Sequence, residues 1–277
     1  MKQKPESLYL DLLKDTLSFS LWPEPPIPVE VFNYRRSPVK KQFVATLSQV
    51  LGSRNMYLVK ESVISTDDKQ YGRTRVTYGD TMIGRKRLDN LQYCIETVLQ
   101  DGVEGDLIET GVWRGGACIF MRAVLAAYGV EDRKVFVADS FEGLPAPDAN
   151  NFPADAGDKH HTHNTYLGVS RKEVEENFEK YGLLDDQVIF LEGWFIDTLP
   201  QAPIEKLAVL RSDGDMYEST IETLENLYPK LSSGGFCIID DYALPGCEAA
   251  VNDYRSEHGI SAELVEIDWT GRYWRKE

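Results

Sequence analysis

Several features that mark common classes of protein are scarce or missing in this sequence. Its 277 residues include four cysteines and four histidines, and no Cys-x-x-Cys pair occurs. No apolar run approaches the ~18 residues that a membrane-spanning helix needs. The net charge is −15, and no basic run is long enough to override it. These absences argue against a cysteine-based zinc site, a membrane protein and a nucleic-acid-binding surface.

The first residues also lack the signature of a secretory signal, because no apolar stretch follows the charged residues 1–7. The cysteines are scattered and fall mostly in helix or strand patterns. We therefore expect a cytoplasmic protein whose thiols are reduced and mostly buried. The four positions are Cys94, Cys118, Cys237 and Cys247.

From residue 106 the chain alternates short apolar runs with amphipathic segments, which predicts an α/β fold of the doubly wound type. Strands are expected at 107–109, 135–139, 188–192, 207–212, 235–240, 264–268 and 272–274, with helices near 116–128, 170–181, 217–231 and 246–258. Only three residues separate the last two strands, so they should form an antiparallel hairpin. The sheet is thus expected to have seven strands and to be mostly parallel.

The first 78 residues read differently from the domain expected over 79–277. Leucines at helical spacing predict a helix over 6–20 with Ser7 as its cap. A proline-rich arm follows at 22–28, then a helix over 38–60, and a further amphipathic helix over 84–100 precedes the first strand. Residues 1–78 are either a peripheral extension packed on the core or a lid or dimer contact, and we expect a homo-oligomer, a dimer or higher.

The turn after the first strand is the feature around which the chain is organised. Glu109 closes the strand, Gly111 makes the turn, and Gly115 and Gly116 open an apolar helix. Glycines allow a ligand to approach the backbone, and a helix N-terminus attracts an anion. The spacing departs from the Gly-x-Gly-x-x-Gly dinucleotide fingerprint. An amino-acid-like ligand, which carries both an anion and an ammonium group, would suit this turn.

Acidic side chains follow the other expected strands, at the edge where such sheets bind ligands. Asp139 could accept the hydroxyls of a ribose or cap a helix, and Trp194 could stack on an adenine or fill a gap. Asp213, Asp240 and Asp241 would meet at two strand ends and, unpaired, would repel one another. A divalent cation such as Mg²⁺ resolves that repulsion, although solvated carboxylates are the alternative. Asp215 is a candidate helix cap.

The polar loop over 152–167 contains His160, His161 and His163. A histidine there could act as a general base near neutral pH, or the loop could simply face solvent. No thiol or carboxylate companion stands at zinc-ligand spacing, so a zinc site is disfavoured.

Taken together, several of these segments resemble the macrocin O-methyltransferase family. The resemblance runs from about Leu8 to the C-terminus, and the segments that carry it are Thr81-Met-Ile-Gly-x-Lys-Arg-Leu-Asp-Asn90, Glu109-Thr-Gly-Val-Trp-Arg-Gly-Gly116, Ala138-Asp-Ser-Phe-Glu-Gly-Leu-Pro145, Glu192-Gly-Trp-Phe-Ile-Asp-Thr-Leu-Pro200, Leu210-Arg-Ser-Asp-Gly-Asp-Met-Tyr217 and Ile239-Asp-Asp-Tyr242. Several separated motifs in the same order make the match specific. The family has the class I S-adenosylmethionine methyltransferase fold, and its relatives act on macrolide and aminocoumarin sugars.

The resemblance implies a role for particular residues. S-Adenosylmethionine would contact Thr81, Met82, Glu109, Gly111, Asp139, Ser140, Trp194 and Tyr217. Mg²⁺ would be held by Asp213, Asp240 and Asp241. The resemblance also implies that Asp213 helps to deprotonate the acceptor hydroxyl and that His161 assists.

We therefore expect a donor- and Mg²⁺-dependent O-methyltransferase that acts on a hydroxyl of a sugar or another diol-bearing natural product in secondary metabolism, such as antibiotic biosynthesis. Three alternatives remain at this point. One is a catechol-type aromatic acceptor, which would satisfy a metal equally well. The others are an NAD-dependent dehydrogenase and a non-catalytic binding module on the same fold.

Overall fold

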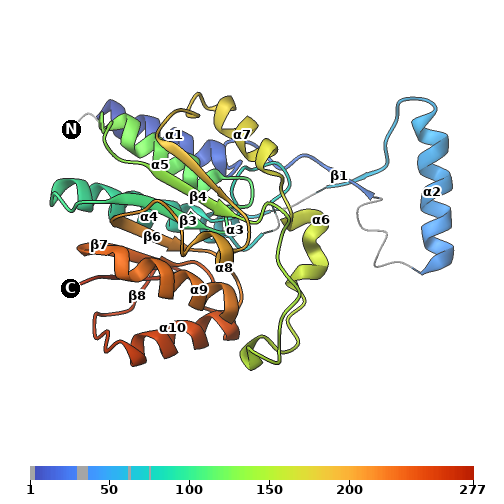
Figure 1. Cartoon of the computed structure of the whole chain (residues 1–277). Coiled ribbons are helices and arrows are strands. Elements are labelled where there is room, and N and C mark those ends of the chain that lie inside the picture. The colour runs from blue at the N-terminus through green and yellow to red at the C-terminus, as the bar shows by residue number, and fades with distance from the viewer. Residues whose placement is uncertain (1–3, 30–36, 62–63, 75) are drawn as a thin grey trace.

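The computed structural model describes residues 4–29, 37–61, 64–74 and 76–277. Their main feature is a seven-stranded sheet whose spatial order is β5-β4-β3-β6-β7-β9-β8 (Figure 1). The strands are β3 (Asp106–Thr110), β4 (Val135–Asp139), β5 (Val188–Glu192), β6 (Leu207–Ser212), β7 (Leu231–Ile239), β8 (Val265–Glu266) and β9 (Arg272–Arg275). The first five run parallel, and β9 is antiparallel to both β7 and β8. The expected fold class, with its C-terminal antiparallel hairpin, is therefore confirmed.

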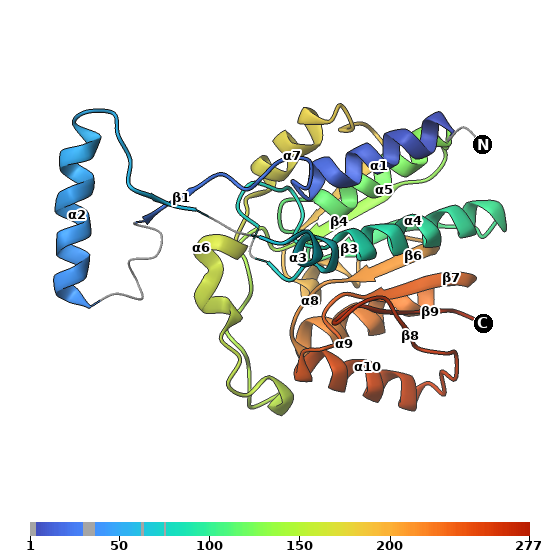
Figure 2. The ribbon, with the colours of Figure 1, turned by 180° about the vertical axis from the view of Figure 1, so that it is seen from behind.

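Helices cover both faces of this sheet, as Figures 1 and 2 show. One face packs against α1 (Pro5–Leu17), α4 (Arg85–Gln100), α5 (Gly116–Ala127) and α7 (Arg171–Lys180). The other packs against α8 (Phe195–Thr198), α9 (Tyr217–Leu227), the short turn η4 (Tyr228–Lys230) and α10 (Pro245–Glu257). Because helices cover both faces, β6 is buried over its whole length, and its first four residues (207–210) are all apolar.

The strand order reverses direction between β3 and β6 at the centre of the sheet. In open sheets of this type, a crevice for ligands forms at the carboxyl ends of the strands on either side of such a reversal. A site is therefore expected among the loops that follow β3, β4, β5, β6 and β7.

The first helix belongs to the main core. It buries Leu10, Leu13 and Leu17 and packs beside α5. The expected cap at Ser7 is wrong, because the helix begins at Pro5 and Ser7 lies within its first turn. Proline favours that first position, since its fixed φ suits a helix and it has no N–H to leave unpaired.

The predicted helix over 38–60 is also corrected. Helix α2 (Pro38–Gly52) ends early, and β2 (Val59–Lys60) pairs with β1 (Ile27–Pro28) in a small separate sheet. Gly52 and the positive φ of Asn55 explain the break. Figures 1 and 2 show α2 standing apart from the helices around the large sheet. The short helix α3 (Thr66–Tyr71) leads back to α4.

Smaller corrections concern the C-terminal half. The helix expected over 217–231 ends at Leu227, and β7 begins at Leu231 rather than 235. The strand expected over 264–268 is reduced to β8, so the hairpin turn is longer than three residues. Within the described ranges, no helix combines the length and apolar character needed to cross a bilayer.

Candidate functional site

A cavity of about 300 Å³ lies at the carboxyl ends of the central strands. It is formed by the turns after β3, β4, β5 and β6 and by the first turns of α9. The residues that line it are Met82, Gly111, Trp113, Asp139, Ser140, Gly143, Leu144, Pro145, Leu167, Trp194, Phe195, Ile196, Asp213, Gly214, Asp215, Glu218, Ser219 and Glu222. The cavity thus combines an apolar wall with several carboxylates, which suits a ligand that carries both apolar and cationic groups.

Gly111 makes the turn after β3 in a conformation that suits glycine alone. Its φ is +84°, and a Cβ there would overlap the carbonyl oxygen of Asp213. The two turns are also linked by hydrogen bonds, because the Asp213 amide donates to the Thr110 carbonyl at 2.9 Å. The main chain after β3 and the main chain after β6 are therefore in direct contact.

Asp139 ends β4 and lines the cavity beside Ser140. Its Oδ2 accepts from the Val112 amide at 2.7 Å, and its Oδ1 accepts from the Phe141 amide at 2.7 Å. Burial raises the pKa of this carboxyl, while the amide donors oppose that shift. The carboxylate is fixed in place, and since each oxygen can accept more than one hydrogen bond, it can still receive a ligand hydroxyl.

Trp194 follows Gly193 at the end of β5 and precedes α8. Its side chain is 38% exposed and lines the cavity together with Phe195 and Ile196. Met82, which was also expected at the site, lies in the same wall. An exposed indole on the wall of an open cavity is free to stack on a planar ligand.

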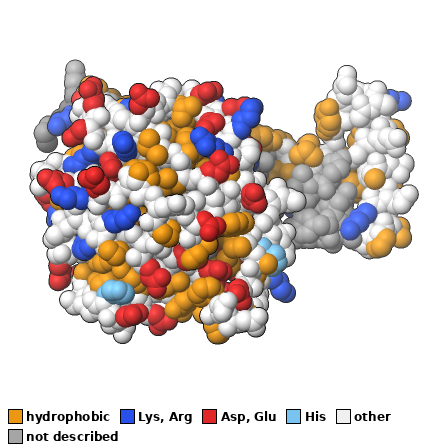
Figure 3. Space-filling view, in the orientation of Figure 1, with side chains coloured by type: hydrophobic (Ala, Val, Ile, Leu, Met, Phe, Trp, Pro, Cys, Tyr) orange, Lys and Arg blue, Asp and Glu red, His pale blue; other side chains and the backbone are white. Residues whose placement is uncertain are grey.

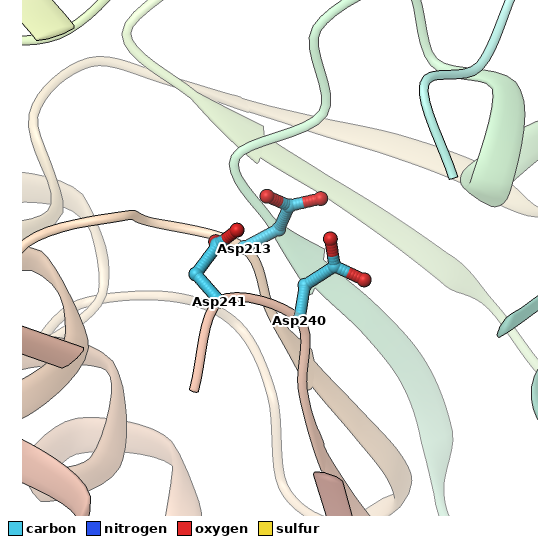
Figure 4. Close-up of side chains that lie close together, drawn as sticks. All are labelled: Asp213, Asp240 and Asp241. Atoms are coloured by element: carbon cyan, nitrogen blue, oxygen red, sulfur yellow. The ribbon is translucent and has the colours of Figure 1, made fainter. Parts of the chain in front are cut away.

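Asp213, Asp240 and Asp241 come together where β6 and β7 end (Figure 4). One carboxylate oxygen from each lies within 4.8 Å of the others. Burial and the neighbouring acidic groups raise the pKa of Asp213 and raise that of Asp241 strongly. The three side chains were expected to meet here, and the structure brings them together.

Two arginines that the sequence analysis did not consider pair with these carboxylates. Arg211 is 1% exposed and donates to Glu109, to Asp240 and, at 2.8 Å, to Asp213 Oδ2. Arg87 on α4 donates to the other oxygen of Asp240 and, at 3.1 Å, to Asp268. Both oxygens of Asp240 are therefore already ion-paired, so arginines relieve part of the repulsion that was expected among the three carboxylates.

Even so, the two guanidinium groups do not balance the acidic charge. Glu109, Asp213, Asp240, Asp241 and Asp268 all belong to this network, against two arginines. Burying uncompensated charge is costly, and the raised pKa values of Asp213 and Asp241 express that cost. Closely spaced carboxylate oxygens with surplus negative charge are the donor set that Mg²⁺ prefers, so the residues fit this ion.

Three residues expected to contact the methyl donor lie outside the cavity wall. Glu109 is buried behind it, where it accepts from Arg211 and from Cys118 Sγ at 2.9 Å. Thr81 is buried and accepts from the Ile83 amide at 3.3 Å. The Tyr217 hydroxyl donates, at 3.1 Å, to Asp253, which lies on α10.

The histidines lie in the loop between β4 and α7, within the short turn η3 (His160–His163). His160 Nδ1 is 2.6 Å from Asp158 Oδ2, and His163 is exposed. The Nδ1 atom of His161 is buried without a hydrogen-bond partner among the described residues. Among the three, His161 is thus the one with a buried Nδ1 that has no partner in the described part of the chain, and it does not line the cavity.

The sequence and fold of this chain are similar to those of known methyltransferases. Residues 6–276 match the family model described as macrocin-O-methyltransferase. The chain is 50% identical over 275 residues to the 8-demethyl-8-(2,3-dimethoxy-alpha-L-rhamnosyl)-tetracenomycin-C 4′-O-methyltransferase of Streptomyces olivaceus, which covers 99% of this chain and 95% of that protein. It is 48% identical over 271 residues to the mycinamicin III 3″-O-methyltransferase of Micromonospora griseorubida, covering 97% and 96%.

Two solved structures of methyltransferases are also similar to this chain. The O-methyltransferase NovP superposes with a TM-score of 0.83 at 44% identity and covers 98% of this chain and 99% of that one. The calicheamicin methyltransferase CalS11 has a TM-score of 0.58 at 19% identity, with 87% and 93% covered, and so supports the fold alone.

Proposed function

Since this chain belongs to the macrocin O-methyltransferase family and is an O-methyltransferase, we propose that it transfers a methyl group from S-adenosylmethionine to a sugar hydroxyl of a natural product, with the help of Mg²⁺. The acceptor class follows from its relatives, which are named for a rhamnosyl tetracenomycin, a mycinamicin and a novobiocin precursor. The observation that carries the proposal is the cavity lined by Gly111, Asp139, Trp194 and Asp213, because Asp213 also belongs to the acidic triad with Asp240 and Asp241.

The cavity has a place for each part of the donor. The open main chain at Gly111 would face the amino-acid end, Asp139 would accept from the ribose hydroxyls, and Trp194 would stack on the adenine. Ser140 and Met82 would complete the wall. S-Adenosylmethionine supplies an electrophilic methyl group on a sulfonium. The residues of the chain have to bind it, orient it and exclude water, since no covalent intermediate is required.

Glu109, Thr81 and Tyr217 are proposed to act from behind the wall. Glu109 holds Arg211, and Thr81 supports the turn that carries Met82. The Tyr217 backbone lies at the start of α9, directly after the turn that carries Asp213. These residues would then hold the donor pocket in shape, and direct contact with the donor would require a shift on binding.

Asp213, Asp240 and Asp241 are the proposed Mg²⁺ ligands. A divalent cation at the triad would supply Lewis acidity that lowers the pKa of an acceptor hydroxyl. Arg87 and Arg211 each donate to one oxygen of Asp240, and each of these oxygens still has a lone pair that could bind a cation. Asp213 would also accept a hydrogen bond from the acceptor hydroxyl, and the unpartnered Nδ1 of His161 supports a role for that histidine in taking up the proton.

The N-terminal part is proposed to serve assembly. Residues 37–60 contain Lys40, Lys41, Arg54 and Lys60 and no acidic residue, whereas the whole chain has a net charge of −15. Val39, Phe43 and Val50 are exposed on α2. Figure 3 shows hydrophobic and basic side chains on the part of the molecule that contains α2. We propose that residues 1–78 extend the domain of residues 79–277 and that α2 contacts the acidic surface of a second copy.

The four cysteines are free and buried. Reduced thiols persist in reducing compartments, which supports the proposal of a cytoplasmic enzyme. The acidic character of the chain supports a small-molecule substrate rather than nucleic acid or a membrane surface.

The test is methyl transfer from labelled S-adenosylmethionine to a panel of glycosides and catechols in the presence of Mg²⁺. The Asp213→Ala variant should lose at least about 100-fold in turnover, while calorimetry shows unchanged donor binding. The exposed Asp186→Ala, at the far end of the sheet, is the control. Normal turnover of Asp213→Ala with the cation chelated would refute the metal-assisted mechanism, and binding of NAD in place of the donor would refute the function itself.

A further inference from the structure

The loop that joins β4 to α7 contains a buried carboxylate for which the site described above has no role. We call residues 141–168 the crossing loop; it contains the turns η2 (Pro153–Asp155) and η3 and the short helix α6 (Asn164–Leu167). Asp155 is only 3% exposed, whereas its neighbours Ala154 and Ala156 are exposed. A carboxylate is seldom buried in a surface loop unless it has partners.

The partners of Asp155 lie 62 and 63 residues away, at the start of α9. Its Oδ1 accepts from the Tyr217 amide at 2.7 Å, and its Oδ2 accepts from the Glu218 amide at 3.0 Å. These are two of the amides that a helix start leaves without a partner inside the helix. Met216, at the capping position, provides no side-chain cap, so Asp155 caps α9 from a distant segment.

Asp155 also touches the start of α10. A Cβ placed on Gly246 would lie 2.6 Å from Asp155 Oδ1 and 3.0 Å from the Tyr217 amide nitrogen. The carboxylate is thus seated between the first turns of two helices. Next to it, the ring of Phe152 lies 6.0 Å from the ring of Tyr217, so the crossing loop meets α9 through a second side chain. Figure 1 shows this loop in yellow-green beside the ends of α9 and α10.

The position of these two helix starts gives Asp155 its significance. Helix α9 follows the turn that contains Asp213, and α10 follows the turn that contains Asp240 and Asp241. One side chain therefore meets both helices that leave the acidic triad. A few residues further along the same loop is η3, which contains His161.

We propose that Asp155 is a positioning residue for methyl transfer, because it fastens the crossing loop, and with it His161, to the two helix starts beside the acidic triad. This role in the reaction rests on the proposed function, but the fastening itself does not. Asp155 does not line the cavity proposed for the donor. It acts through the loop, whose base is closed separately where Asn164 pairs with the main chain of Leu144.

The fastening can be measured without any catalytic assay. Lys159 is exposed and is the only Lys or Arg between Lys134 and Arg171, so trypsin cleavage after it reports opening of the crossing loop. Loss of a capping carboxylate should raise the population of the open loop, and hence the cleavage rate, about tenfold. We expect this for Asp155→Ala and a smaller rise for Asp155→Asn, which keeps one acceptor oxygen.

Asp148→Ala is the matched control. Asp148 lies in the same loop and also accepts from two amides, those of Asn150 and Asn151, but these contacts stay within the loop. Its removal should leave the Lys159 cleavage rate within about twofold of the wild type. Equal rates for Asp155→Ala and Asp148→Ala would overturn the proposal.

Gly246→Ala provides a second, independent variant in case Asp155→Ala does not fold. Alanine is a better helix former than glycine, so helix propensity alone predicts a more protected protein. The added methyl group would displace the Asp155 carboxylate, so our proposal predicts faster cleavage after Lys159 instead. Slower or unchanged cleavage would overturn it.

The kinetic readout separates positioning from a general loss of structure. Asp155→Ala should lower kcat/KM for the acceptor about tenfold or more, while the Kd for S-adenosylmethionine stays unchanged because Gly111 directly follows β3 and Asp139 ends β4. A matching loss of donor affinity would overturn the positioning role. If no acceptor is methylated by the wild type, the proposed function fails, and the trypsin result still decides whether Asp155 fastens the loop.

Discussion

Replacing Arg211 by methionine should unbalance the charge network beneath the site more than any other single change. The arginine is 1% exposed and donates to Glu109, Asp213 and Asp240. Methionine keeps a similar length and packing but leaves three carboxylates without this partner. The variant therefore measures how much free energy the buried cation contributes to the folded chain.

Removing one partner of a buried ion pair costs about 3–5 kcal/mol, because the remaining charge stays buried. Protonation of the abandoned carboxylates limits the cost. Burial already raises the pKa of Glu109 to about 7, so this group readily becomes neutral. We therefore expect the free energy of unfolding of Arg211→Met to be about 4 kcal/mol lower than that of the wild type. For a chain of this size, the midpoint of thermal unfolding should fall by about 10 °C.

The assay is thermal and urea unfolding in chelator and then in excess Mg²⁺. A cation bound to the triad replaces part of the lost positive charge, and at 100 times its Kd it adds about 2.7 kcal/mol to the folded state. Arg171→Met is the control, because Arg171 also pairs with two carboxylates, Glu175 and Glu192, but is 43% exposed. Exposed pairs contribute less than about 1 kcal/mol. A similar loss in the two variants would refute the argument from burial.

Two further predictions follow from the turns and from the titrating groups. Gly111→Ala should lower the free energy of unfolding by about 2 kcal/mol or more, and donor affinity by at least about tenfold, because its Cβ would overlap the main chain at Asp213. The control is Gly102→Ala: Gly102 also has a positive φ (+66°) but open space around it, so the cost should be about 1 kcal/mol. Burial raises the pKa of Glu109 and of Asp215 to about 7 in the metal-free chain, so the folded state binds these protons more tightly than the unfolded state. Stability in chelator should therefore fall as pH rises from about 4.5 through about 7, by up to about 3 kcal/mol for Glu109. Urea midpoints across this range should fall less steeply in Glu109→Gln, and midpoints that rise with pH would contradict the assignment.

The fold was largely predictable because its signals are local. Continuous apolar runs that end in glycine or aspartate indicated the five parallel strands, and the short connection before Arg272 indicated the hairpin. The errors arose where glycine has two meanings. Gly234 and Gly235 suggested the start of a strand but lie within β7, where the register with β6 shifts. Gly52, in contrast, ends a helix that the apolar pattern alone would have continued.

The site was predictable only where the topology rule applies. Because the carboxyl ends of parallel strands meet at one edge, the sequence alone predicts that Asp213, Asp240 and Asp241 lie together, as they do. Arg87 could not be placed there, because it is 153 residues from Asp240 and reaches it from a helix. Arg211 offered one signal, since an arginine inside a buried apolar strand needs a buried partner.

The contact between the turns after β3 and β6 has a consequence for how such a chain can diversify. Gly111 brings main chain against main chain, so the turn that would face the donor and the turn that carries a proposed cation ligand are in direct backbone contact. The distance between the donor part and the cation part of the cavity is therefore set by the peptide backbone. Lining residues that hold neither the donor nor the cation could therefore change to admit a different acceptor, while the distance between the two parts of the cavity stays the same.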